Sequence, residues 1–183
     1  MSVIKQHNVK SGKGTLYNEK INIIPPKQGV NIGKFCAIGP NLTIMGVNHD
    51  YNYPALQYTF YKKYFGQDHP GVIKSTKVYS KGPVNIGSDV WFGNDVVVMS
   101  NVTIGDGCCI GARSVVTKDL EPYTICVGTP SKSIKKRYSD DVIEFLLDLK
   151  WWDWDDDKIK KNKEFFNANL NEISIDQIKD MII

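Results

Sequence analysis

The hydrophobic residues of this chain recur every six positions over two blocks. From Ile86 the sequence divides into the units IGSDVW, FGNDVV, VMSNVT, IGDGCC, IGARSV and VTKDLE. An aliphatic or aromatic residue opens every unit, glycine stands second in four of the six, and a small or medium side chain stands fifth. The same frame appears upstream as IGKFCA and IGPNLT, from Ile32, with a third start at Ile44. A period of six fits neither an α-helix nor a simple alternating strand, and its repetition indicates a solenoid.

A prism with flat sides explains the period of six. If each unit forms one short strand and one turn, three units close a triangular coil of about eighteen residues, and residues 86–121 make two such coils. The first- and fifth-position side chains then point inward, and glycine after the first suits a tight corner. Stacked coils pair as parallel strands and bury one another's side chains. Nine in-frame units argue against a run of ordinary strands, so we predict a mainly β fold, a parallel β-helix.

The six-residue frame ends after Ile44, and the sequence from about residue 50 to 82 predicts a loop that leaves the solenoid. The stretch YNYPALQYTFYKKYF contains seven aromatic residues among fifteen, which argues against disorder. A lone prism offers no surface that buries so many aromatic side chains. We therefore predict that the loop packs on a partner subunit in a homotrimer.

The C-terminal part predicts helices. SDDVIEFLLDLKWW favours a helix capped by Ser139, with Val142, Leu146 and Leu149 on one face that covers the open end of the solenoid. SIDQIKDMII, at the C-terminus, favours a short amphipathic helix. The predicted organisation is a β-helix domain over residues 1–138, including the loop, and a helical extension over residues 139–183.

Composition narrows the functional classes. The chain has 183 residues, 42% of them hydrophobic, and a net charge of +3, which is too small to indicate a nucleic-acid partner. The N-terminal residues lack an apolar segment and no stretch is long enough to span a membrane, so we expect a cytoplasmic protein. The four cysteines show no metal-ligand spacing and are expected to be reduced and buried. They are Cys36, Cys108, Cys109 and Cys126.

Three segments together resemble a known family. The run GSDVWFGNDVVVMSNVTIGDGCCIGARSVVTKDLEPY and the segment VGTPSKSIKKR look like the hexapeptide-repeat acyltransferases, and FLLDLKWWDWDDDKI is similar to the C-terminal segment of their xenobiotic acetyltransferase branch. That branch acetylates chloramphenicol or streptogramins, and related enzymes acetylate sugars and polysaccharides. The resemblance covers about residues 30–160. It implies a left-handed β-helix, acetyl-CoA as the donor, and sites shared between the subunits of a trimer.

The same resemblance implies a catalytic histidine at the root of the excursion loop, in the dipeptide Asn48-His49. Transfer of an acetyl group from a thioester needs a base to take the acceptor's proton, and imidazole suits neutral pH. His49 is therefore predicted to be that base. His69, in GQDHPG, is a second candidate, and His7 is interpreted as a surface residue. Three histidines without metal-ligand spacing make a zinc site, as in β-helical carbonic anhydrases, a poor alternative.

The family match also implies the donor site along the C-terminal coils. Trp91 and Asn94 would lie near the thioester and the pantetheine, and Ala112 would contact the pantetheine arm through its backbone. Thr117 and Lys118 would line the next stretch.

The cluster KSIKKR follows these coils and supplies positive charge. By the resemblance, Lys132 and Lys135 would bind the nucleotide phosphates, with Lys136 and Arg137 nearby. A phosphate-bearing ligand favours such clustered Lys and Arg side chains. A solvated basic turn is the alternative interpretation.

The acceptor is predicted to be a carbohydrate, whether free, linked to a nucleotide or within a polysaccharide. Tyrosines of the loop offer flat faces and hydroxyl groups that suit a sugar, whereas a large apolar antibiotic needs a deeper apolar pocket. Asn48, Asp50, Tyr51 and Tyr53 are the predicted acceptor-binding residues. Acetylation of chloramphenicol or a streptogramin is the alternative within the enzyme class. A non-catalytic β-helical scaffold is the alternative from another class, because a fold does not fix a function.

Overall fold

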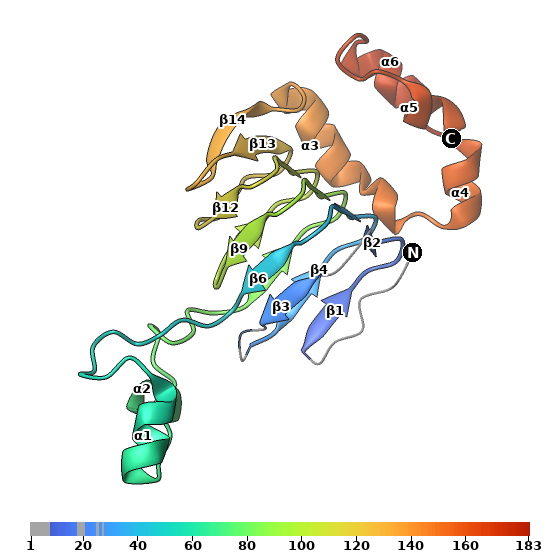
Figure 1. The fold of residues 1–183 in the computed structure, drawn as a ribbon. Helices are drawn as coiled ribbons and strands as arrows, with labels where there is room; N and C mark the ends of the chain where they lie inside the picture. The colour runs from blue at the N-terminus through green and yellow to red at the C-terminus, as the bar shows by residue number, and fades with distance from the viewer. Residues whose placement is uncertain (1–7, 18–20, 25, 27) are drawn as a thin grey trace.

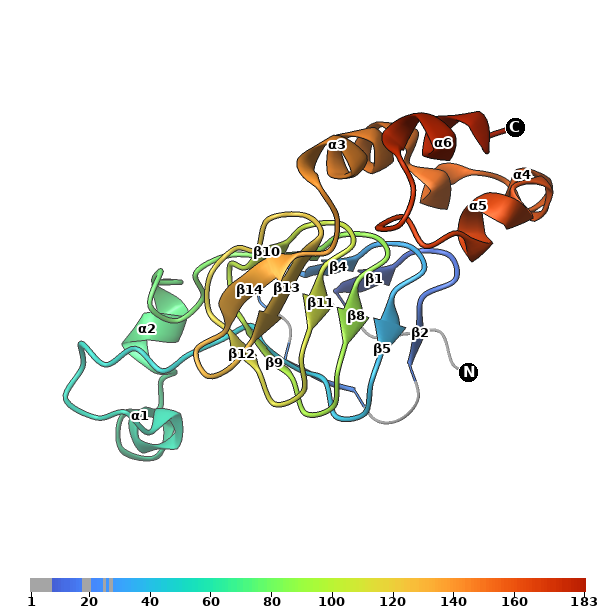
Figure 2. The ribbon, with the colours of Figure 1, turned by 90° about the horizontal axis from the view of Figure 1, so that it is seen from above.

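The computed structural model describes residues 8–17, 21–24, 26 and 28–183. Its centre is a three-sided prism of short strands, drawn in Figure 1 from the side and in Figure 2 from above. One side consists of β1 (Val9–Ser11), β4 (Val30–Ile32), β7 (Val84–Ile86) and β10 (Thr103–Ile104). The second consists of β2 (Leu16–Tyr17), β5 (Ala37–Ile38), β8 (Trp91–Phe92), β11 (Cys109–Ile110), β13 (Thr124–Val127) and β14 (Lys132–Lys136). The third consists of β3 (Asn22–Ile24), β6 (Thr43–Met45), β9 (Val97–Met99) and β12 (Val115–Val116).

Strand register confirms the eighteen-residue coil. Asn85 pairs with Thr103, Trp91 with Cys109 and Val97 with Val115, so between these two coils each side of the prism advances by eighteen residues. All of the pairs between successive coils are parallel, and among the strands of the described residues only β13 and β14 pair antiparallel. The predicted left-handed parallel β-helix is confirmed.

The inward positions are the predicted ones. First-position residues from Ile32 to Val116 and fifth-position residues from Cys36 to Ser114 are buried, and Phe92, Val96, Val98 and Ile110 are fully inaccessible. Leu120, at the last fifth position, is only half-buried. Every coil therefore contributes its apolar side chains to one continuous core.

The corners are built differently from the prediction. The left-handed backbone falls on the fourth residue of every complete unit except the last, for example Asp89 (φ 56°) and Asn101 (φ 60°), and not on the glycine at the second position. Asp and Asn are among the residues that tolerate this conformation. The second-position glycines are needed because the next coil approaches closely. A Cβ on Gly93 would lie 2.6 Å from the backbone nitrogen of Ala112.

The N-terminal segment forms an additional coil. The family resemblance begins only at about residue 30, but β1, β2 and β3 pair with β4, β5 and β6 at an offset of 21 residues, as in Val9↔Val30 and Asn22↔Thr43. The longer offset explains why the six-residue frame does not extend into this coil. His7 lies outside the described residues.

Residues 50–82, here called the arm, leave the prism after β6 and return before β7 (Figure 1). The predicted loop contains two helices, α1 (Tyr58–Phe65) and α2 (Pro70–Ile73). The arm projects from the side of the prism opposite the C-terminal helices (Figure 2).

The C-terminal extension contains α3 (Asp140–Leu149), the 3₁₀ helix η1 (Trp151–Asp153), α4 (Asp156–Lys161), α5 (Lys163–Asn167) and α6 (Ile175–Asp180). Helix α3 begins after Ser139 as predicted, but the Ser139 hydroxyl hydrogen-bonds Asp141 and lowers the pKa of that carboxyl, and does not cap the backbone. Helix α6 begins at a capping box formed by Ser174 and Gln177.

Helix α3 does not cover the open end of the solenoid. It runs along the flank of the prism, from the last coil toward the first (Figure 1). Trp151, which follows α3, packs on Phe35 with ring centroids 5.3 Å apart, and Lys34 pairs with Asp153. The strand edge of the last coil is covered by β14. This chain closes its sheet edge with its own antiparallel strand, which leaves the helix free to brace several coils at once.

Candidate active site

His49 lies where the arm leaves the prism. Its side chain is exposed, and Nδ1 lies 2.7 Å from the carbonyl oxygen of Leu56. A carbonyl oxygen only accepts, so Nδ1 carries the proton in this hydrogen bond and Nε2 keeps its lone pair. No other described residue hydrogen-bonds the ring. Nε2 is therefore available to take a proton from a bound molecule.

Tyr58, on α1, contacts both His49 and its neighbour Asn48. Its ring lies 4.6 Å from the imidazole of His49, and its hydroxyl donates to the backbone carbonyl of Asn48 at 3.0 Å. Burial raises the pKa of the Tyr58 hydroxyl, so the group stays protonated and remains a donor. The arm thus contacts both the ring of His49 and the backbone beside it.

His69 is a structural residue of the arm. The side chain is buried, and Nδ1 accepts from the backbone N–H of Gly71 at 3.0 Å, which caps α2. The rings of Tyr53, Tyr58 and Tyr61 surround it, with centroids 4.4–5.1 Å away. The alternative assignment of His69 as the base is therefore wrong, because no substrate reaches a ring enclosed in this way.

Two predicted acceptor-binding residues also serve the arm. Asp50 is buried and accepts from the Thr76 hydroxyl at 2.6 Å and from the backbone and side-chain nitrogens of Asn52. These hydrogen bonds, the Thr76 bond first, lower the pKa of Asp50. Tyr53 packs edge-on against His69. Neither side chain lines the pocket at His49, because each is used to hold the arm together.

The pocket at His49 has a volume of about 710 Å³. Its lining residues are Asn48, His49, Tyr51, Lys77, Val78, Lys81 and Asn101. A neighbouring pocket of about 440 Å³ shares Asn48, Lys81 and Asn101 and continues to Thr117 and Lys118. The two form one groove along the corner that follows β6, β9 and β12. The structure thus brings His49 and two of the predicted donor residues to the same groove.

The other predicted donor residues lie elsewhere in the chain. Trp91 and Asn94 line a separate pocket of about 270 Å³ on the side of the prism that contains β8. Ala112 follows β11, at the corner next to Asn94. Lys132 and Lys135 are exposed on β14. One chain therefore presents the predicted donor site in two halves, on two different corners of the prism.

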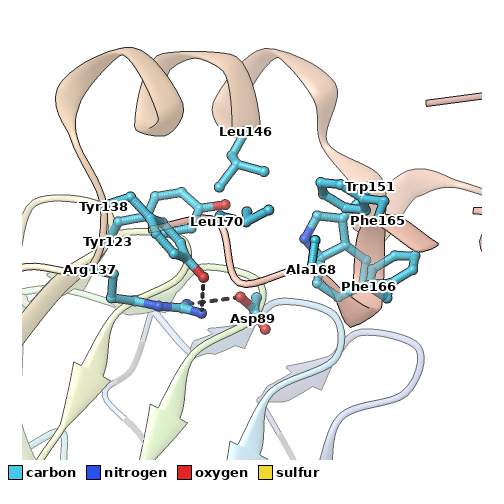
Figure 3. A pocket seen from close by; sticks show the side chains of 10 residues that line it. All are labelled: Asp89, Tyr123, Arg137, Tyr138, Leu146, Trp151, Phe165, Phe166, Ala168 and Leu170. Atoms are coloured by element: carbon cyan, nitrogen blue, oxygen red, sulfur yellow. Dashed lines mark hydrogen bonds and ion pairs between the residues drawn. The ribbon is translucent and has the colours of Figure 1, made fainter. Parts of the chain in front are cut away.

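Arg137 is a structural residue as well (Figure 3). Its guanidinium donates to the Asp89 carboxylate at 3.0 Å, to the Gly107 carbonyl and to the Tyr138 hydroxyl. The same group lies over the rings of Tyr123 and Tyr138. Arg137 thus fixes the chain between β14 and α3 and does not present its charge to a phosphate.

Sequence reasoning did not find Leu56, Lys77 and Lys81, and it grouped Tyr58 with the loop tyrosines expected to suit a sugar, because the arm has no repeating pattern that assigns positions. Asn101 could have been predicted, since the six-residue frame places it one coil beyond His49 at the same corner of the prism. Among residues 8–17, 21–24, 26 and 28–183, no group of three His, Cys, Asp or Glu side chains is placed to hold a metal. Over the same residues, no helix is long and apolar enough to cross a membrane.

Comparisons with known proteins agree with the fold. The family described as "Bacterial transferase hexapeptide (six repeats)" matches residues 83–118. A chloramphenicol acetyltransferase of Escherichia coli is 35% identical over 88% of this chain and 83% of its own. A probable macrolide acetyltransferase of Lysinibacillus sphaericus is 44% identical over 78% of this chain and 80% of its own.

Two solved structures are similar. A maltose O-acetyltransferase of Clostridium difficile is 32% identical with a TM-score of 0.56, over 71% of this chain and 59% of its own. A hexapeptide-repeat acetyltransferase of Vibrio cholerae, in complex with acetyl coenzyme A, is 25% identical with a TM-score of 0.55, over 71% of this chain and 61% of its own.

Proposed function

Because this chain belongs to the hexapeptide-repeat acetyltransferases, enzymes that use acetyl-CoA, we propose that it acetylates a hydroxyl group of a carbohydrate with His49 as the general base. The observation that carries the proposal is the hydrogen bond from Nδ1 of His49 to the Leu56 carbonyl, which leaves Nε2 without a partner among the described residues, on a side chain that lines a pocket of about 710 Å³.

The proposed reaction needs one base in one position. Nε2 of His49 removes the proton of the acceptor hydroxyl while its oxygen attacks the thioester carbonyl of acetyl-CoA. The tetrahedral intermediate then collapses and expels the CoA thiolate. The imidazolium returns the proton to that sulfur, so the enzyme ends the cycle unchanged.

The donor is proposed to lie along the groove that ends at Thr117 and Lys118. Its phosphates would lie at Lys132 and Lys135, where two exposed ammonium groups stand on one strand. Arg137 supports this site only indirectly, because it anchors the end of β14.

A homotrimer is proposed to complete the donor site. Trp91, Asn94 and Ala112 lie on a different corner from His49, so a neighbouring copy must bring that corner to the groove. Trp91 is 48% exposed and Leu16, in the same register column, is 38% exposed, which leaves apolar surface for such a contact. The trimer is the assembly implied by the family resemblance.

A carbohydrate acceptor is supported by the hydrogen-bonding groups of the side chains around the His49 pocket, whose apolar parts make up the larger share of its exposed lining. The reason differs from the one drawn from the sequence, because Tyr53, Tyr58 and Tyr61 are packed inside the arm and Tyr51 alone among the loop tyrosines lines the pocket. The remaining lining side chains are amides and ammonium groups, with Val78 as the apolar exception. Such a surface suits an acceptor rich in hydroxyl groups.

Chloramphenicol or another antibiotic is the second candidate acceptor. It is favoured by the relatives at 35% and 44% identity, which are a chloramphenicol acetyltransferase and a probable macrolide acetyltransferase. A cytoplasmic location, where acetyl-CoA is made, is proposed together with the donor, and the four free cysteines are compatible with it.

The test is a comparison of acceptors. The purified protein is given acetyl-CoA with chloramphenicol, with a group A streptogramin, or with a panel of free and nucleotide-linked sugars, and release of the CoA thiol is followed. We expect turnover with a sugar. Efficient turnover of an antibiotic with no sugar acetylated would assign the second function instead.

A further inference from the structure

The pocket at His49 contains two lysines that no acidic group of the described residues neutralises. Lys77 and Lys81, both exposed, come from the returning limb of the arm and line the pocket together with His49. Neither forms an ion pair or a side-chain hydrogen bond within the described residues. Two lysine side chains therefore line the same pocket as His49.

The nearby carboxylates are already used. Asp50 is buried and accepts hydrogen bonds from Thr76 and Asn52. Asp119 lies in the neighbouring pocket with Lys118, where its carboxylate accepts from the backbone N–H of Thr103 at 2.7 Å. Neither is paired with Lys77, and the pocket at His49 has no acidic lining residue.

The donor does not account for this positive charge. Its phosphates are assigned to Lys132 and Lys135 on β14, which is four strand spacings from β5, the strand of the coil that precedes His49. At about 4.8 Å per spacing, β14 lies roughly 19 Å along the prism from that coil. Only the uncharged acetyl end of the donor reaches His49. An anion beside Lys77 must therefore come from the other substrate.

We propose that the acceptor is anionic, and that Lys77 and Lys81 bind a carboxylate or phosphate carried by the sugar whose hydroxyl His49 deprotonates. This inference rests on the proposed function, because it assigns the acceptor class of the same site. A charge fixed beside the reacting hydroxyl orients the sugar as well as attracting it. It also selects against neutral molecules of similar size, since binding them leaves both ammonium groups unpaired.

The experiment compares sugars that differ only at one carbon. Methyl glucoside, methyl glucuronoside and methyl glucoside 6-phosphate present a hydroxyl, a carboxylate and a phosphate at the same position, and matched galactose and mannose series extend the set. Binding is measured by ligand-observed NMR at low and high salt, and acetylation is measured by release of the CoA thiol. The comparison of the carboxylate sugar with the phosphate sugar shows which anion the site binds.

The variant is Lys77→Gln combined with Lys81→Gln, and the matched control is Lys74→Gln, an exposed lysine of the arm outside the pocket. We expect an anionic sugar to bind more tightly than its neutral partner, and salt to weaken that binding. The double variant should lose about tenfold or more of the affinity for the anionic sugar, as for the loss of a charged hydrogen bond. The KM for acetyl-CoA should not change, and Lys74→Gln should behave as the unmodified chain.

The outcomes separate the two proposals. Selective anion binding that the double variant abolishes, without acetylation of any sugar, supports the anionic pocket and contradicts carbohydrate acetylation. Acetylation of neutral and anionic sugars with equal efficiency, unchanged in the double variant, contradicts the inference and leaves the proposed function standing. Absence of selective binding for every anionic sugar also overturns the inference.

Discussion

The prism and the arm solve the problem of holding a side chain in place in two different ways. In the prism, a residue's environment follows from its position in a unit of six, and buried residues such as Phe92 and Val98 repeat down the stack. In the arm, no position repeats, and a few individual contacts around His69 and Asp50 hold the chain. His49 stands at the junction: the side chain of its neighbour Asn48 hydrogen-bonds Ser100 of the prism, and the ring of His49 is fixed by the arm.

This difference separates stability from positioning. Each coil of the prism is buried by its neighbours, so the free energy of unfolding resides mainly in the stack. The arm makes few contacts with that core and its order depends on side-chain hydrogen bonds and aromatic packing. Changes in the prism should therefore unfold the protein, whereas changes in the arm should alter the reaction and leave the fold intact.

The largest expected effect is on stability, from Phe92→Ala. The side chain is fully buried in the prism, and its loss leaves a cavity that costs about 3–5 kcal/mol of unfolding free energy. Phe65→Ala, the same change at a residue of the arm that is 61% exposed, is the control and should cost far less. Urea unfolding followed by circular dichroism measures both. Equal losses would show that the arm carries as much of the stability as the prism.

Asp50→Asn should reverse that pattern, with a small effect on unfolding and a large one on turnover. Asparagine cannot accept all the hydrogen bonds that Asp50 receives from Thr76 and Asn52, so the base loses its alignment. Misplacement by about 1 Å can cost on the order of a hundredfold in rate. Asp68→Asn, at an exposed aspartate of the arm, should leave the rate unchanged.

The pH dependence of the arm follows from the same residue. The pKa of Asp50 is lowered from 3.8 in the folded protein, so its stabilising contribution is complete above that value and is lost as the pH falls through the lowered pKa. Hydrogen-exchange protection of residues 50–82 should therefore decrease below about pH 3.8. Asp50→Asn should show no such decrease, and a decrease of the same size in that variant would assign the acid sensitivity to another group.

Replacement of Lys132 and Lys135 by alanine tests the proposed phosphate site on β14. Removing two ammonium groups should raise the KM for acetyl-CoA about tenfold, the scale of a lost charged hydrogen bond. The effect should be smaller with the dephospho-CoA thioester, which has fewer phosphate charges. Lys161→Ala, an exposed lysine of α4, serves as the control. Equal increases with both donors would remove these lysines from the phosphate site.

The smallest effect is expected from Tyr58→Phe. The change keeps the ring beside His49 and removes the hydrogen bond to the Asn48 carbonyl, which is worth about 0.5–1.5 kcal/mol, so kcat should fall several-fold. Tyr64→Phe, at a tyrosine of α1 that is 61% exposed, should have no effect. A loss that appears in KM for the acceptor and not in kcat would make Tyr58 a binding residue.

The prism could be predicted from the sequence because each repeat places its apolar residues at the positions that become buried. The period of six identified the inward residues, the eighteen-residue coil and the corner at which His49 stands. It did not identify the first coil, from Val9, because that coil is 21 residues long. It also attributed the corners to glycine, since a pattern of letters does not distinguish a left-handed residue from a close approach of two backbones.

The site was harder to predict because its residues meet only in three dimensions. Asp50 and His69 were interpreted as chemical candidates from their residue types, and their partners Thr76 and Gly71 are what make them structural. Arg137 looked like part of a basic cluster until its contact with Asp89 was known. The assignment of His49 to catalysis came from the family resemblance and is supported by geometry that the sequence does not contain.

The central claim is that Nε2 of His49 removes the acceptor's proton. The most direct test uses an acceptor identified in the comparison above. The turnover of His49→Ala is measured with that acceptor under saturating acetyl-CoA, and acetyl-CoA binding is measured by calorimetry. We expect kcat to fall by about a hundredfold to ten-thousandfold, the usual contribution of a general base, with donor affinity unchanged. Turnover near that of the unmodified chain would contradict the claim.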